Sequence, residues 1–327
     1  MDPIRAELQL GNYLYDQQIV ELRLRRAFLP VIDRLRVVFP AHVAMEGEPG
    51  DEVVLALDGG EGSANVFTGT IAHIVRGIER LELTAYGGAG RLAAYRPAVT
   101  LEGKTAGDVI RSLCSDIDVS LGSVDDGPSL SLFVADGRAT ATEEIADLAA
   151  LMGARAAFDA DDSLHVSAQG PGQDVALRYG RELVDVRTMG AAPDAISRTV
   201  VGEGAQAAGG SKALWVITDF LGGGEAPGPE ARRRTLPRLR STDDATTAGT
   251  AWSSRVGDGL AQVRMRTWLL PKLAPGARVQ LEDVPDHVGL SECRVHQVMH
   301  VFSARTGARS DVWCTGQTDS AGLGGLF

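Results

Sequence analysis

Two histidines four residues apart are the first candidates for chemistry in this sequence. His296 and His300 have an HxxxH spacing, but they lie in a segment that alternates apolar and polar residues, which predicts a strand. Four residues of strand span about 13 Å, too far for two imidazoles to reach one ion at about 2 Å. We expect both side chains on the face of Arg294, opposite Val295 and Met299, as solvated or interface histidines.

A cluster of aspartates superficially resembles a calcium loop. Asp159, Asp161 and Asp162 crowd one short segment. An EF-hand loop also needs a glycine at its sixth position and a glutamate at its twelfth, where this sequence has Leu164 and Gly170. The pattern therefore favours a β-turn held by hydrogen bonds to an aspartate side chain.

Other patterns that could carry chemistry are absent or incomplete. The glycines at 60–62 and 222–224 lack the spacing of nucleotide-binding loops and are interpreted as turns. GxSxG and HExxH motifs are missing. Cys114, Cys293 and Cys314 are an odd number without a CxxC pair, which favours reduced, buried thiols over a disulfide framework or zinc site. The sequence thus predicts no catalytic residue, no metal site and no cofactor.

One basic cluster stands out against an acidic chain. Arg232, Arg233 and Arg234 lie in the segment 221–239, whose glycine and proline content is typical of a long exposed loop. Two interpretations stay open: the cluster docks an acidic neighbour or a phosphate, or it belongs to a solvated loop.

Composition bounds the class of protein. The chain has 327 residues, of which 44% are hydrophobic and 23% charged, as expected for a soluble globular protein of two domains, or of one with an insertion. A net charge of −11 disfavours sequence-specific binding of nucleic acid, because the chain repels phosphates. No apolar run is long enough to span a membrane. The first residues lack the layout of a secretory signal.

The elements fall into three regions. Residues 1–97 show the alternation of short strands, with Phe67, Ile71 and Val75 expected on one face. Residues 98–172 predict an α/β unit with helices at 105–118 and about 140–152, each opened by a capping box. Residues 173–327 return to strands, with the loop 221–239, a helix from Ser241, a hairpin at Thr306–Gly307 and a flexible tail. The expected fold is mainly β, with a small α/β domain between two antiparallel β domains.

The order of these segments resembles the phage late control D family, the baseplate hub proteins of contractile tails and contractile injection systems. The resemblance rests on segments spread over most of the chain. In the first region these are DEVVLALDGGEGSANVFTGTIAHI and the stretch that leads to TAGDVI. In the middle it is EEIADLAALMGARAAFDADDSLHV, and near the end LAPGARVQLEDV followed by CRVHQVMHVFSARTGARSDVW.

The resemblance implies a fold and a role. Two tube-protein-like antiparallel β-barrels, at 1–97 and 173–327, would flank the α/β domain at 98–172. Three chains would form a homotrimeric ring that joins a six-fold inner tube to a three-fold central spike and leaves a channel for cargo. Its partners would be itself, the tube protein and the spike protein, with baseplate wedge and tape-measure proteins as further candidates. The chain would be assembled in the bacterial cytoplasm and become part of the particle's baseplate.

The resemblance implies a structural, non-enzymatic protein without cofactors. Two other classes remain open: a β-rich module that binds cell surfaces or carbohydrates, and a hydrolase whose site is not recognisable from sequence. If the chain does line a channel, its negative charge predicts a wall that is not dominated by Lys and Arg, because a passing cargo should not be held tightly.

Overall fold

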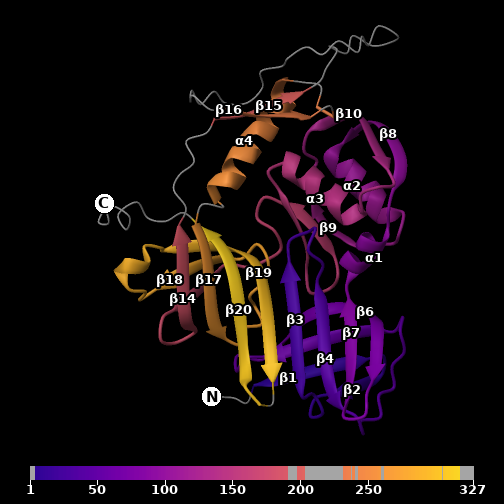
Figure 1. Ribbon diagram of the computed structural model, residues 1–327, viewed down its shortest axis with the longest axis vertical. Coiled ribbons are helices and arrows are strands. Elements are labelled where there is room, and N and C mark those ends of the chain that lie inside the picture. The colour runs from indigo at the N-terminus through magenta and orange to yellow at the C-terminus, as the bar shows by residue number, and fades with distance from the viewer. Residues whose placement is uncertain are drawn as a thin grey trace.

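The computed structural model describes residues 4–190, 197–202, 231–236, 238–239, 242–258, 261–303 and 305–316. These residues form an elongated, mainly β molecule with an α/β part on one side (Figure 1). This confirms the fold class expected from the sequence. None of the described helices is long and apolar enough to cross a bilayer.

The N-terminal β region packs alternate residues of its strands into one core. Leu22 and Leu24 are fully buried, whereas Arg23 between them is exposed, as the period of a strand requires. The long strand β6 bends across this region, so that it pairs with β7 and β5. The strands are β1 (Arg5–Leu10), β2 (Tyr13–Tyr15), β3 (Glu21–Ala27), β4 (Arg34–Pro40), β5 (Glu52–Asp58), β6 (Ser63–Arg76) and β7 (Arg80–Tyr86).

The middle region contains the predicted helices, and each begins at its predicted cap. Thr105 and Asp108 form a capping box at the start of one helix, and Thr140 and Glu143 do so at the other. Their apolar faces share one buried core with short strands. The elements are α1 (Gly88–Ala94), β8 (Ala98–Thr105), α2 (Ala106–Ser115), β9 (Leu121–Val124), β10 (Ser129–Asp136), α3 (Ala141–Leu151), β11 (Arg155–Phe158) and β12 (Leu164–Ser167).

The C-terminal region is again rich in strands and has a third core. Its predicted hairpin at Thr306–Gly307 joins its two longest strands. The elements are β13 (Val175–Arg178), β14 (Leu183–Gly190), β15 (Ser197–Gly202), β16 (Ala231–Leu236), α4 (Thr242–Asp258), β17 (Ala261–Trp268), β18 (Arg278–Glu282), the 3-10 turn η1 (Asp286–Val288), β19 (Glu292–Ser303) and β20 (Gly307–Gly316).

The two β regions share one hydrogen-bonded ladder. Its strand order is β14-β17-β20-β19-β3-β4-β7-β6-β5-β1-β2, and the β19–β3 pair joins the two regions. These strands lie side by side in Figure 1, with β14 to β19 from one end of the chain and β3 onward from the other. The division into domains at 97 and 172 remains a prediction, although three separate cores match its outline.

Several local expectations need correction. Val75 is 61% exposed rather than buried with Phe67 and Ile71, because an irregularity after Ile71 shifts the side-chain alternation. Residues 231–236 are the strand β16, not loop, and pair in parallel with β15. The helix predicted from Ser241 exists as α4, but Ala245 and Ala248 pack into the core of the middle region. The rest of the loop and the predicted flexible tail lie outside the described residues.

Candidate functional site

The two histidines do not form a common site. His300 is fully buried, where Nδ1 is 2.9 Å from Ser310 Oγ and Nε2 is 3.3 Å from the carbonyl oxygen of Leu273. His296 instead lies half-buried between the regions, with its ring edge-to-face on Phe28 at 5.4 Å. The expectation of solvated or interface histidines is therefore wrong for His300, and His296 lies at an interface within the chain.

A β-bulge explains why the sequence pattern misplaced His300. The register of β19 against β20 shifts between Val295 and Gln297, so the residue at 296 has no partner of its own. Beyond this bulge the inward positions are Val298 and His300, and Met299 moves to the outer side. Burial lowers the pKa of His300 to about 3 and, together with nearby arginines, that of His296 to about 4. Both rings are therefore neutral at pH 7.

The aspartate cluster is a turn, as predicted. Asp159 Oδ1 accepts hydrogen bonds from the backbone N–H groups of Asp161 and Ser163, at 3.0 and 2.9 Å. Asp162 has a φ of 62° and accepts a hydrogen bond from the backbone N–H of Gly88, at the start of α1. The cluster thus closes one turn and caps a helix. Among the described residues, no group of three potential ligands could hold a metal ion.

A Ser–His–Asp chain that the sequence did not reveal starts at this turn. His165 Nε2 is 2.8 Å from Asp159 Oδ2, and its Nδ1 is 3.0 Å from Ser123 Oγ. The backbone N–H of Ser123 also donates to Nδ1, at 3.2 Å. This nitrogen already accepts a fixed amide proton, so it is poorly placed to take the hydroxyl proton as a general base. The chain ties β9 to β12 and is interpreted as structural.

The basic cluster lies on β16. The side chains of Arg232 and Arg234 are exposed and two residues apart, so they share one face of the strand. The β15–β16 ribbon lies beyond α4, at the far end of the molecule from β1 and β2 (Figure 1). The cluster is thus presented by a strand rather than by a loop.

The three cysteines are free and buried, as expected. Burial raises the pKa of the Cys114 thiol to about 12, and that of Cys314 is raised by burial and by its neighbour Cys293. Thiols of this kind are unreactive at neutral pH.

The exposed side of the shared ladder is rich in arginine. Exposed residues alternate with core residues along each strand, and the strand register brings them together in rows. We name the exposed side of β14, β17, β20, residues 297–303 of β19, β3, β4 and β7 the arginine face. Its arginines outnumber its carboxylates. The arginines are Arg23, Arg25, Arg34, Arg36, Arg80, Arg187, Arg264, Arg266 and Arg309, and the carboxylates are Glu21, Glu82, Asp185 and Asp311.

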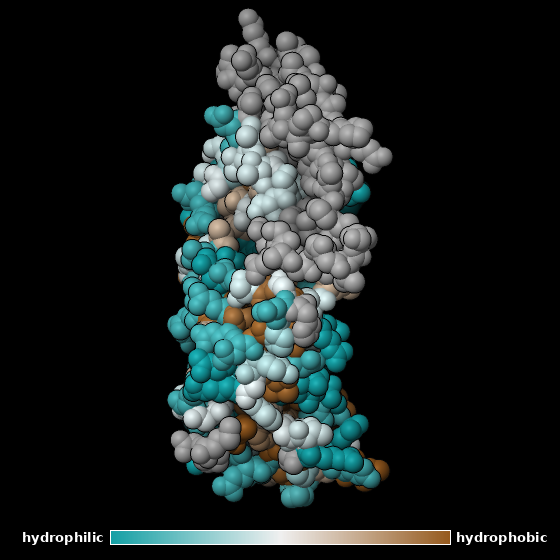
Figure 2. Space-filling model, turned by 90° about the vertical axis from the view of Figure 1, so that its left-hand side faces the viewer, coloured by the Kyte–Doolittle hydropathy of each residue, from teal (hydrophilic) through white to brown (hydrophobic). Residues whose placement is uncertain are grey.

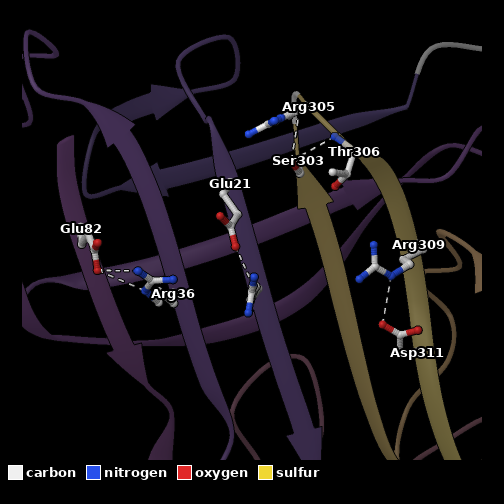
Figure 3. Close-up of polar contacts among 9 residues, drawn as sticks. Glu21, Arg36, Glu82, Ser303, Arg305, Thr306, Arg309 and Asp311 are labelled. Carbon is white, nitrogen blue, oxygen red and sulfur yellow. Dashed lines mark hydrogen bonds and ion pairs between the residues drawn. The ribbon is translucent and has the colours of Figure 1, made fainter. Parts of the chain in front are cut away.

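In the N-terminal β region, Glu82 on β7 is shared by two arginines. Its carboxylate is 2.7 Å from Arg36, a pair drawn in Figure 3, and 3.0 Å from Arg80. The hydrogen bonds from Arg36 lower the pKa of Glu82, so it is ionised at pH 7. Glu21 makes a separate ion pair of 2.6 Å with Arg23.

Two arginines of this region lack such a carboxylate. Arg25 and Arg34 lie directly opposite each other on β3 and β4. Arg25 donates to the backbone carbonyl of Ile32 at 3.3 Å, and its Nε is buried without a hydrogen-bond partner. Arg34 is exposed, and within the described part of the chain no carboxylate lies within ion-pair distance. Like charges directly opposite on a sheet are destabilising.

In the C-terminal β region, Asp311 on β20 is likewise shared by two arginines. It lies 2.9 Å from Arg266 and 3.0 Å from Arg309, the latter drawn in Figure 3. Burial alone would raise its pKa, but the hydrogen bonds from the two arginines lower it overall. Asp311 thus offsets part of the positive charge of the face in this region.

The arginine face is also hollowed in the C-terminal region. Two adjoining hollows of about 260 and 600 Å³ share Arg187, Arg264 and Trp313 in their lining. The guanidinium of Arg264 stacks over the Trp313 ring at 5.3 Å, and Asp185 pairs with Arg187 at 3.1 Å. Seen from the side of β14 and β18, hydrophilic residues cover much of the described surface, broken by hydrophobic patches (Figure 2).

Comparison of the sequence finds no match, either to a protein-family model or to a curated protein. Solved structures do match. The 43 kDa tail protein of prophage MuSo2 from Shewanella oneidensis is similar with a TM-score of 0.70 at 13% identity, over 97% of this chain and 99% of that one. A tail protein from Neisseria meningitidis has a TM-score of 0.69 at 15% identity, over 96% and 97%.

A third similar structure comes from a secretion apparatus. An Escherichia coli component of the type VI secretion system has a TM-score of 0.62 at 11% identity, over 94% of this chain and 76% of that one. At these identities the comparisons establish a shared fold. The protein has the fold of phage tail proteins and of this related secretion component.

Proposed function

We propose that this protein is a structural, non-enzymatic component of a phage tail or contractile injection system, and that it acts as the baseplate hub. In this role three chains form a ring between a six-fold inner tube and a three-fold spike. The observation that carries the proposal is the fold, which is shared over nearly the whole chain with the tail proteins from Shewanella oneidensis and Neisseria meningitidis.

The strand ladder supports the symmetry of such a ring. Each β region has its own core, and the β19–β3 pair makes their sheets continuous. Three copies of a chain with two β units would present six units to the tube. In this arrangement the arginine face, which runs through both units, lines the channel.

Light scattering tests the ring directly. We expect the mass of a trimer for the protein alone or after mixing with the spike protein of the same particle. A monomer in both samples would contradict the trimeric hub. Imaging of the assembled particle would then show whether the chain lies between tube and spike or elsewhere in the tail.

Arg232 and Arg234 on β16 are proposed to dock a neighbouring acidic subunit, together with Arg233. Their exposure and shared strand support this role. We expect particles to assemble poorly with Arg232→Glu/Arg234→Glu, because reversed charges repel an acidic partner. Normal assembly with this variant would count against the docking role and leave the hub proposal intact.

A further inference from the structure

We propose that the arginine face binds an extended, acidic polypeptide segment. The inference deepens the proposed function, because a polypeptide in the channel of a hub would meet this face. Binding itself is a property of the face and can be measured without the particle.

The first argument is the charge pattern on β3 and β4. Arg23 lies opposite Arg36, and Arg25 lies opposite Arg34, so four arginines form a two-by-two block. Only Arg23 and Arg36 reach carboxylates on this face. Like charges directly opposite each other destabilise a sheet. An anion that binds over Arg25 and Arg34 would relieve this repulsion.

The second argument is the hollowed surface on the other β region. Trp313 and the exposed Met189 border the larger hollow, whose volume of about 600 Å³ is sufficient for a side chain. Arg187 and Arg264 lie opposite each other at its edge. An apolar side chain can therefore enter the hollow while a neighbouring carboxylate pairs with Arg264.

The spacing of the two sites fits an extended chain. The path from Arg264 on β17 to Arg34 on β4 crosses four neighbouring pairs of strands, which is about 19 Å at about 4.8 Å a pair. An extended polypeptide rises about 3.3 Å per residue, and its alternate side chains point to the same side. Carboxylates about six residues apart would thus reach both arginine sites at once.

The carboxylates of the face favour a polypeptide over nucleic acid. Glu82 and Asp311 remain ionised at pH 7 and lie among the arginines. A nucleic acid carries a phosphate at every nucleotide and would meet these fixed negative charges, as well as the net charge of −11. A polypeptide can place its carboxylates only where arginines are available.

The test measures binding of a fluorescent peptide of about 14 residues, in which two Glu pairs lie about six residues apart, by anisotropy at low salt. We expect saturable binding, weakened about tenfold by Arg34→Gln or by Arg264→Gln, since each removes a charge-assisted hydrogen bond. The matched control is Arg5→Gln, which removes one exposed arginine of β1, outside the arginine face, and should change affinity less than about twofold. A peptide with Gln in place of Glu should not bind.

Absence of peptide binding by the unmodified protein, or equal losses in the control, would overturn the inference. So would tighter binding of a 14-nucleotide single-stranded DNA than of the peptide. Arg34 is exposed, so Arg34→Gln should unfold at the unmodified temperature or above, which separates lost binding from misfolding. The mass of the unmodified protein by light scattering, alone and mixed with the spike protein, tests the ring independently. A trimer without peptide binding defeats this inference alone, and peptide binding by a protein that stays monomeric in both samples defeats the hub alone.

Discussion

The two β regions carry arginines on the same sheet face but balance them differently. On the arginine face of the C-terminal region each arginine has a partner: Asp311 pairs with Arg266 and Arg309, Asp185 pairs with Arg187, and Arg264 stacks on Trp313. In the N-terminal region Arg25 and Arg34 oppose each other without a carboxylate between them. In one region every arginine of the face therefore contacts a carboxylate or an aromatic ring, whereas in the other region Arg25 and Arg34 keep positive charge that a partner's carboxylate can use.

This difference bears on the expected channel wall. The net charge of the chain predicts a wall that is not dominated by basic residues. If the arginine face lines the channel, that expectation fails, because overall charge says nothing about which face holds the arginines. The acidic residues are then concentrated elsewhere on the molecule.

The two regions should also respond to acid in opposite directions, and this is the largest effect that we predict. His300, in the C-terminal region, has a pKa of about 3 when folded, because it is buried. Its unfolded pKa is about 6.5, so the stabilisation is complete above pH 6.5 and is lost as the pH falls, by about 1.4 kcal/mol per pH unit. His296 acts in the same direction, with a folded pKa of about 4.

Asp33, in the N-terminal region, has the reverse effect. Burial raises its pKa to about 6, although Arg26 partly offsets this. Between pH 6 and about 4 the folded state takes up a proton that the unfolded state does not, so this residue adds stability as the pH falls. Urea unfolding from pH 7 to 5 should show a shallower acid loss for His300→Gln and a steeper one for Asp33→Asn. If the free energy of unfolding of both variants changes with pH as it does for the unmodified protein, the opposite roles of His300 and Asp33 are wrong.

The sequence predicted features that depend on neighbouring residues. Both capping boxes are local patterns, and the structure has them at Thr105 and Thr140. The bulge at His296 has no such local sign, so the sequence pattern assigned His300 and Met299, which follow it, to the wrong faces. The β19–β3 pair joins opposite ends of the chain, and non-local pairing leaves no local pattern.

The arginine face illustrates the same limit. The alternation of Arg23 and Arg25 with leucines is visible in the sequence and marks them as outward residues. Their opposition to Arg36 and Arg34, however, depends on the strand register, which the structure alone supplies. Only the assembled ladder turns scattered arginines into one surface.

Removal of the Asp311 carboxylate should leave arginines without an ion pair in the C-terminal region too, as in the N-terminal region. Asp311→Asn leaves Arg266 and Arg309 without their carboxylate, and we expect a loss of about 1–2 kcal/mol in the free energy of unfolding. Urea unfolding measures this loss. The control is Asp126→Asn, whose ion pair with Arg111 is much more exposed and should contribute less than about 1 kcal/mol. The same Asp311→Asn variant should bind the acidic peptide more tightly, and an unchanged affinity would show that the balance of charge in this region does not limit binding.

The smallest effect that we predict has the opposite sign. Arg34→Gln removes one of two opposed positive charges without breaking an ion pair within the described residues, so it should stabilise the fold by a few tenths of a kcal/mol. Arg36→Gln, on the adjacent row of the same strand, takes a partner from Glu82 and should destabilise it by about 0.5–1 kcal/mol. Paired urea titrations resolve the two signs. If Arg34→Gln is destabilising as well, Arg34 stabilises the folded state, and its positive charge is not left unpaired for binding a partner.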